Sequence, residues 1–118
     1  MLIWSLLLTD KTALLPYQRV GCFKDKRDGR PFPDLVFKYP GLVNDDDLAN
    51  SFAAIIHACA TEVYEKGFWY FGVESKDECW SGANGSLTYN RSGPSSRCLF
   101  KHGVGDKRTI FVYRFVEG

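Results

Sequence analysis

The chain has 118 residues, 45% of them hydrophobic and 15% aromatic, a composition that fits one globular domain and excludes an intrinsically disordered protein. Fifteen basic and fourteen acidic side chains leave a net charge of +1, which gives no support for a nucleic-acid partner. No apolar run approaches the roughly 20 residues of a membrane-spanning helix, so we expect no membrane span in this chain.

The first residues, Met1 to Leu8, have the hydrophobicity of part of a signal peptide. They lack the basic residues that precede such a region and the small residues of a cleavage site. We therefore predict that residues 1–13 are a partial signal-like or disordered segment. Residues 14–118 are predicted to form a single module.

Short β-favouring runs and a loop follow. Residues 17–23 are predicted to form a first strand. Residues 24–34 carry several charges, a glycine and two prolines, which is typical of a loop. Residues 35–39 are predicted to form a second short strand, ended by Pro40 and Gly41.

The clearest element is an amphipathic helix that starts after the acidic run Asp45–Asp47. Its apolar positions recur at helical spacing on one face: Leu48, Phe52, Ile55, Ile56, Cys59 and Val63. Carboxylates at a helix start can accept hydrogen bonds from its unpaired N–H groups and interact favourably with its dipole. Gly67 is placed to end the helix. The acidic run lacks the alternating spacing of a calcium loop, so we expect no metal site there.

The second half of the chain adds the remaining strands. Residues 68–74 are predicted to form a strand buried on both faces, with Trp69 in the core. Residues 83–97 form a polar loop, in which residues 87–89 are a candidate short strand. Residues 109–115 are predicted to form the final strand. The sum is an α+β fold in which one helix packs on a small antiparallel sheet.

Two further patterns indicate an oxidising compartment. The four cysteines are even in number, dispersed, and without a C-x-x-C pair, which favours two disulfides over a zinc ribbon: Cys22, Cys59, Cys79 and Cys98. The alternative is four buried free thiols. Asn84 and Asn90 each begin an N-x-[ST] sequon in the polar loop, so we expect N-glycosylation and an extracellular location.

Several motifs occur in a characteristic order: GCFKD (21–25), a helix with an inward cysteine, YFGVE (70–74), ECWSG (78–82) and a glycine turn before the last strand. This order resembles the WSC domain and, more loosely, the PAN/apple group of extracellular modules, over residues 17–116. The resemblance implies an adhesion or sensing module that binds glycans and has no catalytic activity. The chain has fewer cysteines than a WSC domain usually carries, because Val63 and Ser81 stand where that family often has cysteine.

Four cysteines allow three pairings. Cys22 ends the first strand and Cys98 precedes the last, and the first and last strands of a small sheet are often neighbours. Cys59 faces inward from the helix, and Cys79 follows the aromatic strand that the helix must cover. We therefore predict the bridges Cys22–Cys98 and Cys59–Cys79.

The predicted ligand-binding residues are Trp80, Ser81 and Tyr89. Aromatic faces stack on sugar rings, and neighbouring polar groups orient them. The alternative for Trp80 is a ring that packs over a disulfide. A basic cluster is either an anion-binding loop or a solvated one, and it consists of Lys24, Lys26, Arg27 and Arg30.

The sequence carries neither G-x-S-x-G nor H-E-x-x-H, and His57 has no free thiolate beside it once Cys59 is bridged. We therefore expect no enzyme, no catalytic residues, no metal and no cofactor. The predicted protein is an extracellular, non-catalytic module of a larger secreted or cell-surface protein. Its predicted partner is carbohydrate, and the alternative is protein–protein adhesion without sugar recognition.

Overall fold

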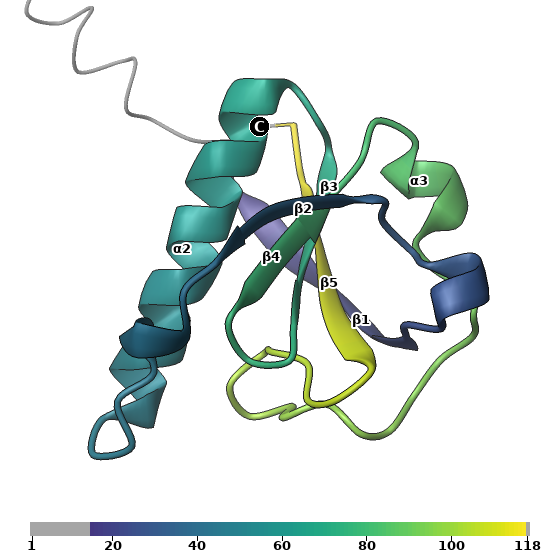
Figure 1. The fold of residues 1–118 in the computed structure, drawn as a ribbon. Coiled ribbons are helices and arrows are strands. Elements are labelled where there is room, and N and C mark those ends of the chain that lie inside the picture. The colour runs from purple at the N-terminus through teal and green to yellow at the C-terminus, as the bar shows by residue number, and fades with distance from the viewer. Residues whose placement is uncertain (1–14, 118) are drawn as a thin grey trace, which may run out of the picture.

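The computed structural model describes residues 15–117, so the predicted segment 1–13 lies outside the described residues. Residues 15–117 form five strands, two α-helices and two short 3-10 helices (Figure 1). Their bounds are β1 (Tyr17–Lys24), η1 (Arg27–Gly29), β2 (Asp34–Lys38), η2 (Pro40–Leu42), α2 (Leu48–Lys66), β3 (Tyr70–Glu74), β4 (Glu78–Ser81), α3 (Gly85–Thr88) and β5 (Thr109–Phe115).

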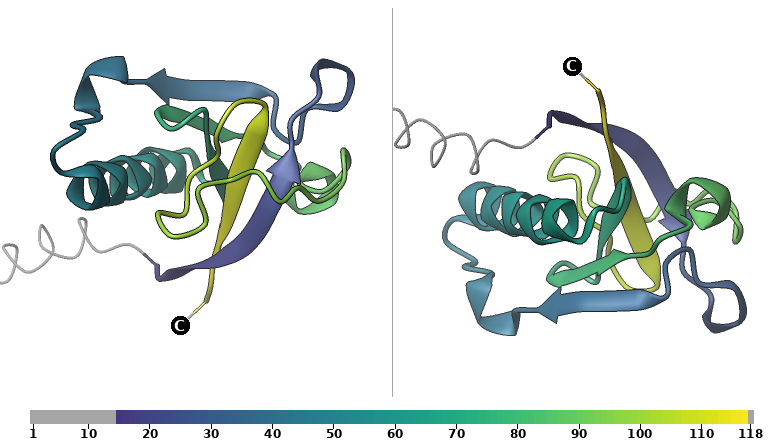
Figure 2. Two further views of the ribbon diagram at one scale, coloured as in Figure 1. Left: turned by 90° about the horizontal axis from the view of Figure 1, so that it is seen from below. Right: turned by 90° about the horizontal axis from the view of Figure 1, so that it is seen from above.

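The five strands form one antiparallel sheet in the order β1-β5-β3-β4-β2. Helix α2 covers one face of this sheet, and views along the sheet place the short helix α3 on the other side (Figure 2). The first and last strands are neighbours, as the disulfide prediction requires. The predicted α+β fold, with one main helix on a small antiparallel sheet, is confirmed.

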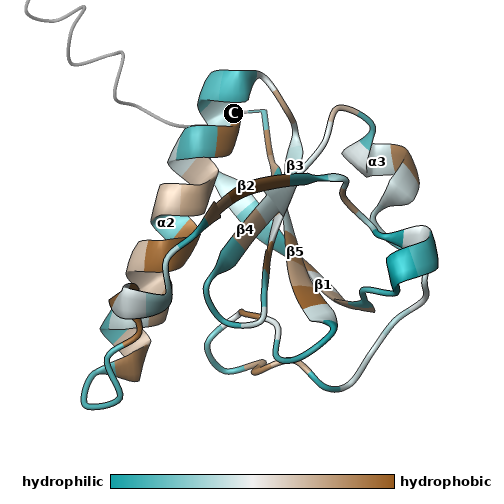
Figure 3. Ribbon diagram, viewed as in Figure 1, coloured by the Kyte–Doolittle hydropathy of each residue, from teal (hydrophilic) through white to brown (hydrophobic). Residues whose placement is uncertain are grey.

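Helix α2 packs on the sheet through the apolar stripe that its sequence predicts. Hydrophobic and hydrophilic residues alternate in bands along it (Figure 3). Its buried residues are Phe52, Ile55, Ile56, Cys59, Ala60 and Val63. Gly67 ends the helix in the left-handed conformation, with φ of 79°, and its N–H donates to the carbonyl oxygen of Tyr64.

Both predicted disulfides are confirmed. Cys22 in β1 is bonded to Cys98, with 6.0 Å between their Cα atoms, and Cys59 in α2 is bonded to Cys79 in β4, with 5.4 Å. The first bridge joins β1 to the segment before β5, and the second joins the helix to the sheet. All four sulfurs belong to the main core between α2 and the sheet.

The opposite face of the sheet carries a second, smaller apolar cluster. Its buried members are Phe32, Ile110 and Val112, with partly buried aromatic rings around them. Helix α3 approaches this face closely at Gly85, where a Cβ atom would lie 2.6 Å from Cβ of Tyr70. The absence of a side chain at Gly85 therefore lets α3 pack against β3.

Two predictions about local structure are wrong. Strand β3 starts at Tyr70 rather than at residue 68, and Trp69 is 47% exposed instead of lying in the core. The reason is that α2 ends at Lys66, so the helix does not extend far enough to cover Trp69. Residues 87–89 do not form a strand, because Gly85–Thr88 form α3, in which the Thr88 hydroxyl donates to the carbonyl oxygens of Asn84 and Pro31.

The loop before β5 is closed by glycines. The carbonyl oxygen of Gly103 accepts a hydrogen bond from the Tyr113 hydroxyl (2.7 Å), and the N–H of Gly105 donates to Val73 (2.8 Å). A Cβ atom at Gly105 would overlap the backbone carbonyl of Thr109. Because backbone cannot yield as a flexible side chain does, only glycine fits at residue 105.

We therefore expect Gly105→Ala to lower the free energy of unfolding by about 2–4 kcal/mol, through overpacking against backbone. Gly41→Ala is the matched control, because a Cβ atom there meets no atom within 4 Å. The control should change stability by less than about 0.5 kcal/mol. Urea denaturation of both variants measures the difference, and equal midpoints would contradict this account of the loop.

Candidate functional site

Trp80 lies in β4 on the sheet face that points away from α2. Its neighbour Cys79 belongs to the main core under the helix, whereas the Trp80 ring packs against the second apolar cluster. Because successive strand residues point to opposite faces, Trp80 cannot cover the Cys59–Cys79 bridge. The alternative in which its ring packs over that disulfide is therefore wrong.

Polar contacts hold the Trp80 ring in place. Its Nε1–H donates to Oε1 of Glu78 (2.9 Å), whose Oε2 lies 3.3 Å from Nζ of Lys38. The Arg30 guanidinium carbon lies 4.5 Å from the centroid of the indole, a cation–π contact. One face of the half-buried Trp80 ring is thus occupied by the Arg30 guanidinium, and the ring helps to hold Arg30 in place.

The other two predicted ligand residues differ from each other. Ser81 is fully buried and its hydroxyl donates to the carbonyl oxygen of Tyr70 (2.6 Å), so a ligand cannot reach it, and its predicted ligand-binding role is corrected. Tyr89 is half-buried, and its ring stacks on Tyr70, with 5.2 Å between the ring centroids. Trp80 and Tyr89 therefore share one face of the sheet, and Ser81 does not reach that face.

An exposed tryptophan that the sequence analysis placed in the core borders an open hollow. This Trp69 hollow has a volume of about 470 Å³ and combines aromatic, charged and hydroxyl side chains. It is lined by Trp69, Tyr70, Ala83, Gly85, Ser86, Arg114, Phe115, Val116 and Glu117. The combination of an exposed indole with hydrogen-bonding groups is the type of surface that sugars bind.

The walls of the Trp69 hollow are held by neighbouring contacts. Tyr89 stacks on the ring of Tyr70, and α3 brings Ser86 to the rim. When the Gln18 amide is turned so that its oxygen faces Arg114, that oxygen accepts hydrogen bonds from Nε and Nη2 of Arg114, at 2.8 Å each. The predicted residue Tyr89 therefore contributes to this hollow only as a support for Tyr70.

Both predicted sequons are accessible. Asn84 and Asn90 are exposed, at the start of α3 and in the turn after it. Asn84 lies between Ala83 and Gly85, which both line the Trp69 hollow. An N-glycan on Asn84 would begin beside that hollow, so it would affect how a ligand reaches the Trp69 hollow.

A second open hollow, of about 1130 Å³, lies where three chain segments converge. We call it the cationic hollow. Its lining consists of residues from 24–30, 95–97 and 106–109, together with Glu74: Lys24, Asp25, Lys26, Arg27, Asp28, Arg30, Glu74, Ser95, Arg97, Asp106, Lys107, Arg108 and Thr109. The predicted basic cluster of residues 24–30 is thus only one side of a larger charged surface.

Two buried carboxyl groups lie at the floor of the cationic hollow. Arg30 Nη1 lies 3.2 Å from Oδ2 of Asp25 and 3.9 Å from Oε1 of Glu74. Asp25 Oδ1 and Glu74 Oε1 accept no hydrogen bond from the described residues. Burial, and then the neighbouring Asp25 carboxylate, raise the pKa of Glu74 to about 9. Glu74 is therefore protonated at neutral pH, and its carboxyl group can donate a hydrogen bond to Asp25.

The residues considered for catalysis and metal binding lie apart. His57 is exposed on α2, and Cys59 is buried and bridged, so they form no nucleophilic pair. The acidic run Asp45–Asp47 is exposed before α2, where Asp47 accepts a hydrogen bond from Asn50 (2.9 Å). Within residues 15–117, no three His, Cys, Asp or Glu side chains are grouped as a metal site requires.

Comparison with known proteins gives partial matches. No family model matches the chain. Over 65 residues, or 55% of the chain, it is 35% identical to "Xylosyltransferase sqv-6" of Caenorhabditis briggsae, and to the protein of the same name in Caenorhabditis elegans. The match spans 7% of the length of each relative.

This match contradicts the prediction that the protein is not an enzyme, because both relatives are named as transferases. The prediction relied on missing catalytic motifs and on a resemblance that implies no catalysis. Neither argument applies here, because a sequence that matches only a small part of an enzyme need not contain that enzyme's catalytic motifs.

The structure is compatible with an extracellular location. Two disulfides are typical of proteins that fold in an oxidising compartment. Among the described residues, no helix has the length and apolar character to cross a membrane.

Proposed function

We propose that this chain is a WSC-like glycan-recognising module of a secreted or cell-surface protein related to the xylosyltransferases. The observation that carries the proposal is the Trp69 hollow, where an exposed indole meets polar side chains on a supported surface. The partial match to enzymes named for xylosyl transfer supports carbohydrate as the ligand class.

The chemistry of the Trp69 hollow suits a sugar. The indole offers an apolar face to the C–H groups of a pyranose ring. The Ser86 hydroxyl donates and accepts, Arg114 donates, and Glu117 accepts, so together they can pair with sugar hydroxyl groups. The hollow is open rather than enclosed, which fits an oligosaccharide lying across the surface.

The ligand-binding role predicted for Trp80 and Tyr89 stays a prediction. Trp69 offers the more accessible ring, because it is 47% exposed whereas Trp80 is half-buried under Arg30. The comparison of Trp69 with Trp80 therefore provides a matched pair of tryptophan variants.

We expect Trp69→Ala to weaken glycan binding about tenfold or more, with little loss of stability, because its ring is exposed. Trp80→Ala should instead lower the free energy of unfolding by about 1–3 kcal/mol, because its ring packs on the second cluster. A glycan array of the secreted chain, followed by titration of the best ligand and thermal unfolding, measures both effects.

The array should include an Asn84→Gln variant, because an N-glycan at Asn84 would begin beside the Trp69 hollow. If neither form binds any glycan above background, the proposed function is wrong. If Trp80→Ala abolishes binding without a stability loss while Trp69→Ala has no effect, the site lies at Trp80 instead.

A specific observation favours protein–protein contact as a second candidate function. Strand β2 lies at the edge of the sheet, and Leu35, Tyr39 and Leu42 on and after it are 50%, 46% and 44% exposed. Exposed apolar groups beside an edge strand are typical of a protein interface. The double variant Leu35→Ser with Leu42→Ser tests this function. It is supported if the double variant loses partner binding while Trp69→Ala keeps it.

A further inference from the structure

We propose that the cationic hollow is a second binding site, and that its ligand is a polyanionic glycan with sulfate or carboxylate groups on successive sugars. The site is separate from the Trp69 hollow, with which it shares no lining residue. The inference goes beyond the proposed function and does not depend on it.

Basic side chains are concentrated in the lining of the cationic hollow. Seven basic and four acidic side chains line the cationic hollow, a surplus of three in a chain whose net charge is +1. The rest of the chain is therefore net negative, and the positive charge of the whole chain is concentrated in this hollow. Such a separation of charge creates a local positive potential that attracts an extended anion.

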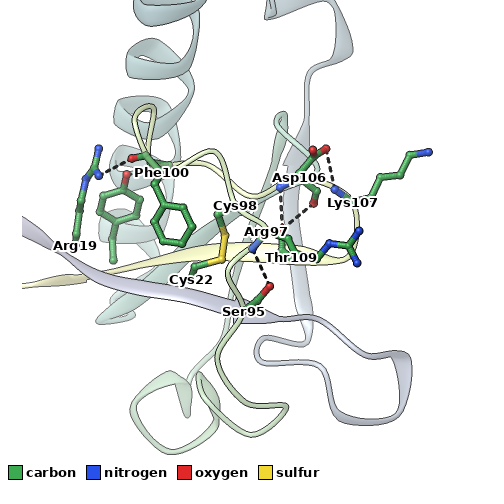
Figure 4. Close-up of a disulfide and its surroundings, with 11 residues drawn as sticks. Arg19, Cys22, Ser95, Arg97, Cys98, Phe100, Asp106, Lys107 and Thr109 are labelled. Atoms are coloured by element: carbon green, nitrogen blue, oxygen red, sulfur yellow. Dashed lines mark hydrogen bonds between the residues drawn. A yellow bond between two sulfur atoms is a disulfide. The ribbon is translucent and has the colours of Figure 1, made fainter.

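The basic side chains of the cationic hollow come from segments far apart in sequence. Arg27 and Arg30 follow β1, whereas Arg97 precedes Cys98, and Lys107 and Arg108 precede β5. The side chains of Arg97 and Lys107 extend toward the same side of the molecule (Figure 4). A solvated loop would account for one such segment, but not for the convergence of three.

Backbone hydrogen bonds fix these segments to one another. The N–H of Asp25 donates to the carbonyl oxygen of Arg108 (2.9 Å), and the N–H of Ser95 donates to that of Cys22 (3.0 Å). The Cys22–Cys98 disulfide lies between the same segments (Figure 4). The charges are thus held in place before a ligand arrives, which reduces the entropy lost on binding.

One residue that lines the cationic hollow is held in a backbone conformation that its side chain disfavours. Arg108 has φ of 56°, in the left-handed region that favours glycine. Its side chain is exposed and lines the cationic hollow. An arginine at this position costs backbone energy that glycine would avoid, which is consistent with a use for its charge.

The floor of the hollow favours an anion rather than a metal cation. The Asp25 and Glu74 carboxyl groups both lie beside the Arg30 guanidinium, and burial, followed by the contact with Asp25, raises the pKa of Glu74 and favours its uncharged form. A cation would have to displace Arg30, which is also held by the Trp80 ring. The basic side chains around this neutralised floor stay free for a ligand.

The class of anion follows from compartment and shape. Two disulfides are typical of an oxidising compartment, which favours an extracellular polyanion such as a glycan with sulfate or carboxylate groups over nucleic acid. The hollow is open, at about 1130 Å³, and most of its basic side chains are exposed. These features fit an extended chain better than a small enclosed ligand.

The test is calorimetric titration with four probes: heparin oligosaccharides, hyaluronan oligosaccharides, poly-glutamate and the neutral glucan laminarin. We expect heparin to bind most tightly, hyaluronan more weakly because it has only carboxylates, and laminarin not at this site. Binding of heparin should weaken steeply as the salt concentration rises, since the interaction is between exposed charges.

Charge-matched variants locate the site. Arg97→Ser with Lys107→Ser should weaken heparin binding about tenfold or more. Lys66→Ser with Lys101→Ser removes the same charge from outside the hollow and should change the affinity less than about twofold. Arg108→Gly should weaken binding without lowering the melting temperature, because glycine relieves its backbone conformation.

Three outcomes would overturn the inference: no heparin binding, an equal loss in both double variants, or equally tight binding of poly-glutamate, which would show a general anion site. Trp69→Ala separates this site from the proposed function. Heparin binding that survives Trp69→Ala supports the cationic hollow whatever the glycan array shows. Glycan binding at Trp69 without heparin binding overturns only the cationic hollow.

Discussion

Removal of the Cys22–Cys98 disulfide, by Cys22→Ala with Cys98→Ala, is expected to lower the free energy of unfolding by about 4 kcal/mol. This bridge spans 76 residues, so it restricts the unfolded chain more than the Cys59–Cys79 bridge, which spans 20. The second bridge should contribute about 3 kcal/mol by the same argument, and its fully buried sulfurs add packing energy.

These are large fractions of the roughly 5–15 kcal/mol by which a typical domain is stable. Guanidinium denaturation of the two double variants and of the oxidised wild type measures both losses. If either variant unfolds at the wild-type midpoint, the bridge that it lacks does not stabilise this fold. Loss of Cys22–Cys98 should also weaken heparin binding, because that bridge fixes the segment that carries Arg97.

Substitution of Glu74 by glutamine is expected to make the protein more stable at alkaline pH. The pKa of Glu74 is raised in the folded state to about 9, so the folded protein binds this proton more tightly than the unfolded chain does. The free energy of unfolding therefore falls as pH rises from the unfolded pKa of about 4.5 toward 9. One such group changes stability by at most about 1.4 kcal/mol per pH unit.

Glu74→Gln removes this dependence, because the amide donates to Asp25 without needing a proton. We expect the variant to exceed the wild type by about 1–4 kcal/mol at pH 8 and to differ little from it at pH 4. Glu62→Gln on the exposed face of α2 is the matched control and should follow the wild type at both pH values. Thermal unfolding from pH 4 to pH 9 measures the curves, and parallel profiles of Glu74→Gln and wild type would contradict the shared proton.

The elements with a strong local pattern could be predicted from the sequence. The apolar stripe of α2 requires burial on one side, and that stripe directs Cys59 toward the sheet. The β1–β5 pairing follows from the tendency of terminal strands to be neighbours in a small sheet, and it brings Cys22 to Cys98. Both disulfides were therefore predictable from residue periodicity and strand order.

The candidate sites depend on relations that no local pattern contains. Trp69 is exposed because α2 ends before it. A strand predicted to start two residues too early therefore placed Trp69 in the core and not at a candidate site. The convergence of Arg97 and Lys107 with residues 24–30 depends on tertiary pairing across more than half of the chain. Glu74 lies in an otherwise apolar strand, and only the contact with Arg30 and Asp25 reveals its role.

The most direct test of glycan recognition is an NMR titration of the nitrogen-15-labelled Asn84→Gln chain with the best ligand from the array. The indole N–H signals report on the tryptophans separately, and Trp69→Phe assigns one of them. We predict that the Trp69 indole signal shifts and saturates as ligand is added, while the Trp80 signal, held by its hydrogen bond to Glu78, shifts little. A saturating titration in which the Trp69 signal does not move would contradict the account.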